Sequence, residues 1–270
     1  NAWAVWLQLL REACADDQED ADADLWLGRG ICERWLGEWQ ESSESFQWSI
    51  ACASQRREWS LLAEARLERS ILLRLRGQFE QAAREQEIVI DLAHRYGDRA
   101  LIERARCERA QIELERQDGE AALAWLQEVG ESSRGLLLRG EAYLLLRDFP
   151  RGRQQIEAAL PLLGDDQVGR AKAHALFGRL LYLDKAFDEA RSQFDTAIIL
   201  LQPTDDEYGL SRVYGNLAAL LVDMPRPDYG EAFELLDHCE ELQRRLGDRV
   251  ALAVTRHNRE YLVSRLAAGS

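Results

Sequence analysis

Apolar residues recur at intervals of three and four along nearly the whole chain, and this spacing predicts amphipathic helices. The best-formed stretch runs from Gly178 to Ala197, where a helix, a short turn and a second helix are indicated. Its order of small and large residues returns upstream in residues 140–159 and 70–89. The pattern therefore predicts an array of similar helix pairs, each packed on its neighbours.

Each expected first helix carries one small residue, which we call the anchor of that helix pair. The anchors are Gly30, Ser70, Ala110, Gly140, Gly178 and Ala218, at intervals of 40, 40, 30, 38 and 40 residues. Helices whose axes cross about 8–10 Å apart leave no room for a large side chain at the crossing. We therefore expect each anchor to face the second helix of its own pair.

The helix pattern predicts one domain with six full repeats and a flanking helix at each end. Residues 1–15 have the pattern of a second helix without its first helix, and residues 248–266 that of a terminal or capping helix. The repeats are expected at 22–55, 60–95, 99–131, 132–164, 167–202 and 207–245. Because the pattern is already under way at residue 1, we expect the repeats to belong to a longer polypeptide.

Two local features refine these boundaries. Connectors such as Gly97-Asp98 and Gly247-Asp248 place Gly after a helix and Asp before the next one, which is typical of a helix stop followed by an N-cap. The 30-residue interval predicts a short second helix that ends near Gly130.

The chain is acidic, with a formal net charge of -14 over 270 residues. This charge opposes attraction to phosphate backbones and to anionic membrane surfaces. No apolar run reaches membrane-spanning length. We therefore expect neither a nucleic acid nor a membrane as a partner.

The five cysteines have no metal-like spacing and mostly fall within the apolar helical pattern; they are Cys14, Cys32, Cys52, Cys107 and Cys239. Buried free thiols in a reducing compartment are the expected explanation. We therefore predict a cytoplasmic protein.

The sequence contains no residues in a catalytic arrangement. It has no Gly-rich loop that ends in Lys-Ser or Lys-Thr and no Gly-x-Ser-x-Gly turn, and its four histidines are dispersed. We therefore expect no catalytic residue, no cofactor and no metal site, and predict that this chain is not an enzyme.

The anchors and the large residues that follow them resemble the tetratricopeptide repeat over roughly residues 22–266. The match is good at Gly140, Tyr143 and Phe149, and weaker where Gly119 replaces an aromatic residue. The resemblance implies an all-α fold, a right-handed superhelical solenoid of antiparallel helix pairs. It also implies that the first helix of each pair lines a concave face that binds a protein or peptide.

Transferring the exposed first-helix positions of that family to this chain gives a candidate binding surface. Its residues are Leu27, Ile31, Arg34, Trp35, Leu67, Ile71, Arg74, Leu75, Arg104, Arg134, Lys172, Arg179, Tyr182 and Arg212. The apolar members predict an exposed groove, although long helices and tight curvature would instead bury them between repeats. Arg104, Arg134, Lys172 and Arg212 share one offset in successive repeats. These cations either meet carboxylates of a ligand or neutralise this protein's own Glu and Asp residues.

Two functions remain open at this stage. The long repeats and the Gly-Asp connectors resemble the sensor region of STAND proteins, which are nucleotide-switched signalling ATPases. That resemblance implies a ligand-sensing module that binds an inducer and contacts an upstream domain of the same polypeptide. The alternative is an independent adaptor or scaffold that bridges two proteins.

Overall fold

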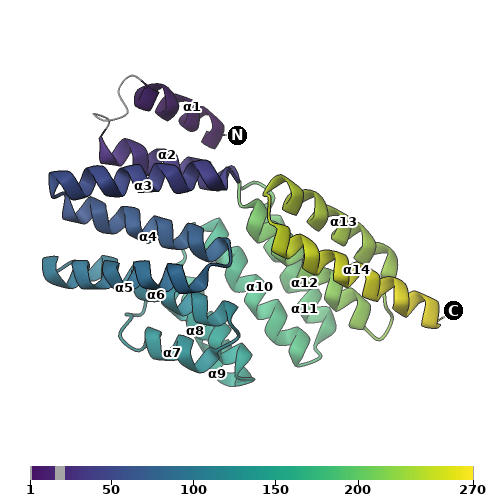
Figure 1. Cartoon of the computed structure of the whole chain (residues 1–270). Coiled ribbons are helices and arrows are strands. Elements are labelled where there is room, and N and C mark those ends of the chain that lie inside the picture. The colour runs from purple at the N-terminus through teal and green to yellow at the C-terminus, as the bar shows by residue number, and fades with distance from the viewer. Residues whose placement is uncertain (1, 16–21, 270) are drawn as a thin grey trace. The chain divides into compact units, whose positions relative to one another are not determined.

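The computed structural model describes residues 2–15 and 22–269, and every regular element in these ranges is a helix (Figure 1). The expected all-α fold is confirmed. The chain divides into two compact units, Asn1–Gly130 (unit 1) and Glu131–Ser270 (unit 2), and each is described separately.

Unit 1 contains a single helix followed by three helix pairs. Its elements are α1 (Ala2–Ala15), α2 (Ala23–Trp35), α3 (Trp39–Arg56), α4 (Trp59–Leu75), α5 (Phe79–Tyr96), α6 (Arg99–Glu115) and α7 (Gly119–Leu126). The pairs are α2 with α3, α4 with α5 and α6 with α7, and the second helices α3 and α5 also pack against the next first helix. The second helix within the 30-residue interval, α7, has only 8 residues, as the short interval predicts.

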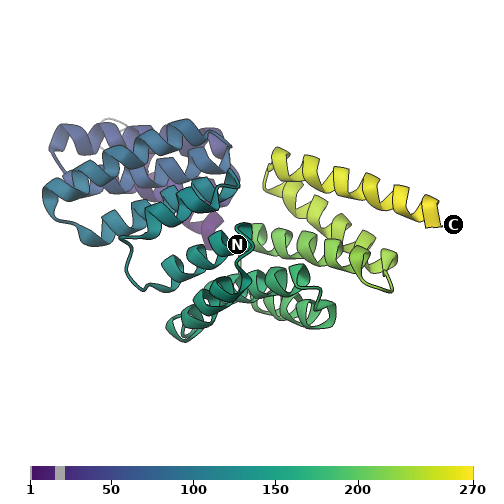
Figure 2. The same cartoon turned by 90° about the horizontal axis from the view of Figure 1, so that it is seen from below.

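Unit 2 contains three helix pairs followed by a single helix. Its elements are α8 (Ser133–Leu145), α9 (Phe149–Ala159), the 3-10 turn η1 (Leu160–Leu162), α10 (Gln167–Leu183), α11 (Phe187–Leu201), α12 (Glu207–Asp223), α13 (Tyr229–Arg245) and α14 (Arg249–Gly269). The pairs α8–α9, α10–α11 and α12–α13 follow one another from teal to yellow-green in the second view (Figure 2).

The connectors stop and restart the helices as expected. Gly97 ends α5 with a φ of 74°, in the left-handed region that glycine adopts without strain. The side chain of Asp98 then accepts a hydrogen bond from the backbone N–H of Leu101 at 3.0 Å, which caps the N-terminus of α6. Asp248 accepts one from the N–H of Ala251 at 2.9 Å in the same way. Each cap satisfies an amide that the helix itself leaves without an acceptor.

The glycine anchors Gly30 and Gly178 lie at the crossings of their helix pairs, as predicted. A Cβ atom added to Gly178 would lie 2.8 Å from Cε1 of Phe194, and one added to Gly30 would lie 2.6 Å from Cε1 of Phe46. Both phenylalanines are fully buried. Glycine at these positions therefore permits a helix approach that a larger residue would prevent.

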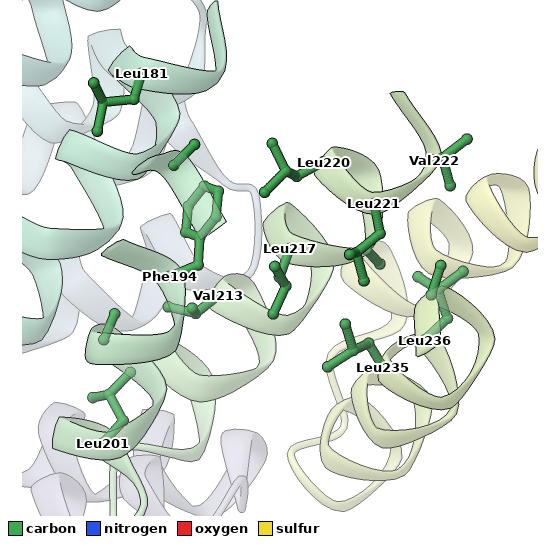
Figure 3. Packing of buried hydrophobic residues seen from close by; sticks show 14 of the residues in the cluster. Leu181, Phe194, Leu201, Val213, Leu217, Leu220, Leu221, Val222, Leu235 and Leu236 are labelled. Atoms are coloured by element: carbon green, nitrogen blue, oxygen red, sulfur yellow. The ribbon is translucent and has the colours of Figure 1, made fainter. Parts of the chain in front are cut away.

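A large hydrophobic cluster of unit 2 joins α10, α11, α12, α13 and, through Leu262, α14. Figure 3 shows Phe194 and Leu201 of α11, Val213 and Leu217 of α12, and Leu236 of α13 within it. The helices of one pair thus contribute to the packing of the next pair. Such nearest-neighbour packing is how repeat arrays are stabilised.

Four of the five cysteines, Cys32, Cys52, Cys107 and Cys239, are free and buried, as expected. The side chain of Cys14 lies outside the described residues. None of the described helices combines the length and the apolarity needed to cross a bilayer. In the same residues no group of three or more His, Cys, Asp or Glu side chains is arranged to hold a metal ion.

Candidate binding surfaces on the first helices

The apolar groove expected on unit 1 is partly closed by packing. Leu27 and Leu67 are only 8% and 1% exposed, so their expected exposure is wrong. Leu27 of α2 packs in a cluster with Ala65 of α4, and Leu67 of α4 packs in a cluster with Ala105 of α6. Both leucines are covered because the next first helix approaches them closely.

The other apolar members of the predicted surface are more accessible. Ile31, Ile71 and Leu75 are partly buried, and Ile31 packs against the cluster that contains Leu27. Trp35 is 39% exposed. Its ring stacks on Trp3 of α1, with ring centroids 5.5 Å apart, and the guanidinium of Arg34 lies 5.4 Å from the Trp35 ring centroid. These contacts hold the Trp35 side chain in place.

The cations predicted on unit 1 pair with carboxylates of the protein itself. Arg34 of α2 donates to Glu68 of α4 at 2.8 Å. Two nitrogens of Arg104 donate to the two carboxylate oxygens of Glu64, each at 2.8 Å. Arg104 therefore neutralises an acidic residue of the neighbouring repeat, which is the second of the two roles considered for these cations.

Arg74 repeats the arrangement of Arg34 one helix pair further along. Its Nε lies 3.3 Å from Oε2 of Glu108 on α6, and a second nitrogen donates to Glu115. The residues of the Arg34–Glu68 and Arg74–Glu108 pairs are both 34 positions apart. The first-helix surface of unit 1 is therefore a repeated ladder of ion pairs.

Burial among these ion pairs raises the pKa of the Glu68 carboxyl. Loss of hydration raises its pKa above the ordinary value, and the neighbouring Glu64 and Glu108 add to the shift. The positive charges of Arg34 and Arg104 oppose the shift without cancelling it.

Unit 2 carries a different distribution of charge. Its first helices carry four of the predicted cations, Arg134 on α8, Lys172 and Arg179 on α10 and Arg212 on α12, and we call these four the cation cluster. Glu141 of α8 accepts a hydrogen bond from Arg179 at 2.8 Å and lies 3.7 Å from Arg212. Lys172 forms no ion pair with any described residue. Arg134, Lys172 and Arg212 are exposed to solvent as whole residues, although the surroundings of the Lys172 ammonium remove much of its hydration.

The pKa values of two groups show that these charges interact. Burial would raise the pKa of Glu141, but Arg212 and Arg179, with Lys172, outweigh it and lower that pKa. The pKa of Lys172 is lowered first by loss of hydration, and the positive charges of Arg134 and Arg212 lower it further. Asp206, the strongest of the neighbouring charges, opposes this shift, and so does Asp166. Loss of hydration is therefore the main cause of the lowered pKa of Lys172, and its ammonium lies within reach of both cations and carboxylates of unit 2.

Tyr182 lies on the same helix as Lys172 and Arg179, one turn after Arg179. Its hydroxyl donates to Oδ2 of Asp223 on α12 at 2.5 Å. Burial, together with this hydrogen bond, raises the pKa of the Tyr182 hydroxyl. The ring lies 6.3 Å from that of Phe187, between centroids. Tyr182 is therefore held by neighbours of its own unit.

Sequence reasoning does not identify which individual carboxylates these cations contact. Glu68 and Glu108 lie two residues before the anchors Ser70 and Ala110, next to positions assigned to packing. Their common separation from Arg34 and Arg74 was the available signal. Glu141 and its partner Arg179 each directly follow an anchor, Gly140 and Gly178, and they lie 38 residues apart.

No protein-family model matches the chain, and no curated protein sequence matches it. Among solved structures, the Rap protein complexed with competence and sporulation factor aligns with a TM-score of 0.66 and 14% identity, over 97% of this chain and 81% of that one. The APC/C hetero-tetramer Cut9–Hcn1 aligns with a TM-score of 0.65 and 14% identity, over 94% of this chain. The present chain spans only 46% of the matched chain in that complex.

A thermophilic tetratricopeptide-repeat protein of Thermus thermophilus aligns with a TM-score of 0.52 and 21% identity, over 72% of this chain and 98% of that one. Identities this low are evidence for the fold alone. The chain has the fold of tetratricopeptide-repeat proteins, built from antiparallel helix pairs.

Proposed function

We propose that this chain is a protein-interaction module and that the cation cluster of unit 2 binds an acidic segment of a partner protein. The observation that carries the proposal is the position of Lys172. It is exposed, forms no ion pair with any described residue and stands beside Arg134 and Arg212 on neighbouring first helices.

The charge of the whole chain makes this cluster unusual. The protein has 48 acidic and 34 basic residues other than histidine, so acidic side chains to neutralise these cations are abundant. The first helices of unit 1 use them in this way, as in the Arg104–Glu64 pair. In unit 2, by contrast, Arg179 and Arg212 share Glu141. A carboxylate-rich ligand would offset the repulsion that Arg134 and Arg212 exert on Lys172.

Proteins with the same fold support an interaction role. The Rap protein is complexed with competence and sporulation factor, and Cut9 forms a hetero-tetramer with Hcn1. In the present chain the ligand would lie across α8, α10 and α12, where Tyr182 follows Arg179 one turn further along the same face of α10.

Fluorescence anisotropy of a labelled oligoglutamate peptide tests the proposal with the full chain. We expect the peptide to bind at low salt and to be released as sodium chloride rises toward about 0.5 M, because salt screens charges at the surface. The double variant Lys172→Gln with Arg134→Gln removes two cations of the cluster. At about 0.2–1 kcal/mol for each exposed ion pair, its affinity should fall about 2- to 30-fold.

The matched control is Lys185→Gln with Arg170→Gln, which makes the same change of charge at exposed positions outside the cluster. We expect it to bind like the wild-type protein. Equal loss of affinity in both double variants would show a non-specific effect of net charge and would refute the site. An oligoglutamine peptide of the same length should not bind to any of the proteins.

Two biological roles are compatible with such a module. The resemblance to STAND sensor regions favours an inducer-binding domain that acts on an upstream ATPase. An adaptor that bridges two proteins is the alternative, and the fold supports both equally. Sequencing the gene around this segment distinguishes them, because the sensor role requires a Walker-type phosphate loop upstream. A gene that encodes only the repeats would exclude that role and favour the adaptor.

A further inference from the structure

A polar pocket in unit 1 has no part in the proposed function. Its volume is about 450 Å³, and residues of α3, α4 and α5 with the α4–α5 turn line it: Ser43, Gln47, Arg69, Leu73, Arg76, Gln78, Gln81, Arg84 and Glu85. The three helices succeed one another along the chain (Figure 1). None of the lining residues belongs to the predicted first-helix surface. The volume is within the range of pockets for small molecules.

The charge of the lining is positive. Arg69, Arg76 and Arg84 line the pocket together with a single acidic residue, Glu85. That carboxylate is buried and already bound, because it accepts hydrogen bonds from Arg69 and from Arg66, the latter at 2.9 Å. Glu85 therefore cannot neutralise Arg76 and Arg84, and neither of these forms an ion pair with the described residues.

The rest of the lining supplies hydrogen-bond donors. Gln47, Gln78 and Gln81 carry amide N–H groups and Ser43 carries a hydroxyl. The Nε of Arg69 is buried and has no partner in the described part of the protein. Such a donor costs free energy unless an acceptor reaches it. Leu73 is the only apolar side chain in the lining.

The beginning of α5 adds a further favourable field for an anion. Gln78 is the N-cap residue of this 18-residue helix, and its side chain forms no capping hydrogen bond. By contrast, the Asp98 side chain caps α6. The first-turn amides of α5 keep the partial positive charge of a helix N-terminus, close to the pocket residues Gln78 and Gln81.

We propose that this pocket binds a small phosphate-bearing anion. The guanidinium groups of Arg76 and Arg84 supply planar pairs of donors, which match phosphate oxygens in charge and geometry. The four uncharged polar side chains supply further donors for the same oxygens. Because the lining comes from two successive helix pairs, bound phosphate holds α3, α4 and α5 together and stabilises unit 1.

Isothermal titration calorimetry of the full chain with inorganic pyrophosphate tests this inference. The variant Arg76→Gln with Arg84→Gln removes the two arginines that lack ion pairs with described residues, and we expect at least about tenfold weaker binding. Arg99→Gln, an exposed arginine of unit 1 outside the pocket, is the control and should bind pyrophosphate like the wild-type protein. Circular dichroism of each variant checks that its helices are intact.

Parallel titrations with glucose 6-phosphate and with inorganic phosphate identify the source of the phosphate group. Tighter binding than for inorganic phosphate indicates an organic phosphate ester, and equal binding indicates the free anion; both support the pocket. Unchanged affinity in the Arg76/Arg84 variant, or no binding to the wild-type protein, would overturn it.

The two proposed sites are tested separately because they lie in different units. The Lys172→Gln with Arg134→Gln variant should keep its affinity for pyrophosphate, and the Arg76/Arg84 variant should keep its affinity for oligoglutamate. If pyrophosphate binding is lost only with Lys172 and Arg134, the anion binds at the cation cluster and the pocket assignment is wrong.

Discussion

Replacing Gly178 by alanine tests how closely the helices of a pair approach. The added Cβ would lie 2.8 Å from Cε1, 2.9 Å from Cδ1 and 3.1 Å from Cζ of Phe194. Phe194 is fully buried within the α10–α14 cluster, and side chains in such cores are closely packed. The substitution therefore forces α10 and α11 apart or displaces the ring.

The expected magnitude follows from two opposing contributions. Alanine in a helix interior is favoured over glycine by about 0.8–1.0 kcal/mol. Overpacking of a buried crossing costs about 1–3 kcal/mol. Gly178→Ala should therefore leave the stability unchanged or lower it by up to about 2 kcal/mol.

Gly215→Ala supplies a matched control in the same unit. Gly215 lies within α12, and its added Cβ would meet only the Sγ of Cys239, at 4.0 Å, an ordinary contact distance. This variant should gain up to about 1 kcal/mol from helix propensity. The difference between the two variants isolates the overpacking cost of about 1–3 kcal/mol.

Urea unfolding followed by far-ultraviolet circular dichroism measures both free energies of unfolding. We expect a lower midpoint for Gly178→Ala than for Gly215→Ala, with the slope of the transition unchanged. If both variants are stabilised equally, the close approach at Gly178 does not exist in solution and the reasoning about anchors fails.

Two further predictions concern caps and acid stability. Asp98→Ala removes the acceptor for the N–H of Leu101 and should lower the free energy of unfolding by about 0.5–2 kcal/mol, measured in urea; an unchanged value would argue against the cap. Arg212 and Arg179 depress the pKa of Glu141 below its ordinary value of 4.5. The ionised Glu141 carboxylate therefore stabilises the fold fully above pH 4.5, and this stabilisation is lost as the pH falls through the pKa of Glu141 in the folded protein. Urea unfolding from about pH 7 to about pH 3 should show that the loss of unfolding free energy in Glu141→Gln, relative to the wild-type protein, becomes smaller in acid. A loss that stays constant with pH would contradict the depressed pKa of Glu141.

The sequence predicts the helix pairs well because their determinants are local. Gly30 and Gly178 indicate a helix crossing through their own small size and the large residue that follows. Asp98 marks a helix start by capping an amide three residues away. These relations repeat along the chain and need no knowledge of distant contacts.

The surface is predicted less well because it depends on how successive pairs approach one another. Leu27 and Leu67 occupy first-helix positions that the resemblance to the tetratricopeptide repeat assigns to an open groove, yet Ala65 and Ala105 of the next first helices pack in the same clusters. The distance between first helices is set by the packing of both pairs and is not encoded in either one.

The same limit applies to the charges. Arg104 and Lys172 share one offset within their repeats, but Arg104 has Glu64 as a partner and Lys172 forms no ion pair with the described residues. Which carboxylate lies within reach depends on the neighbouring repeat. Only the structure therefore separates a neutralised cation from one that is available to a ligand.

The cation cluster is tested most directly by observing Lys172 itself. The chain has two lysines, Lys172 and Lys185, so reductive methylation with isotope-labelled formaldehyde gives one NMR signal for each lysine in addition to that of the N-terminal amine. Titration of the full chain with the oligoglutamate peptide should shift the signal of Lys172 and raise its depressed pKa, because carboxylates then surround the ammonium, while the signal of Lys185 stays in place. Equal shifts of both lysine signals, or no shift of Lys172, would contradict the proposed binding surface.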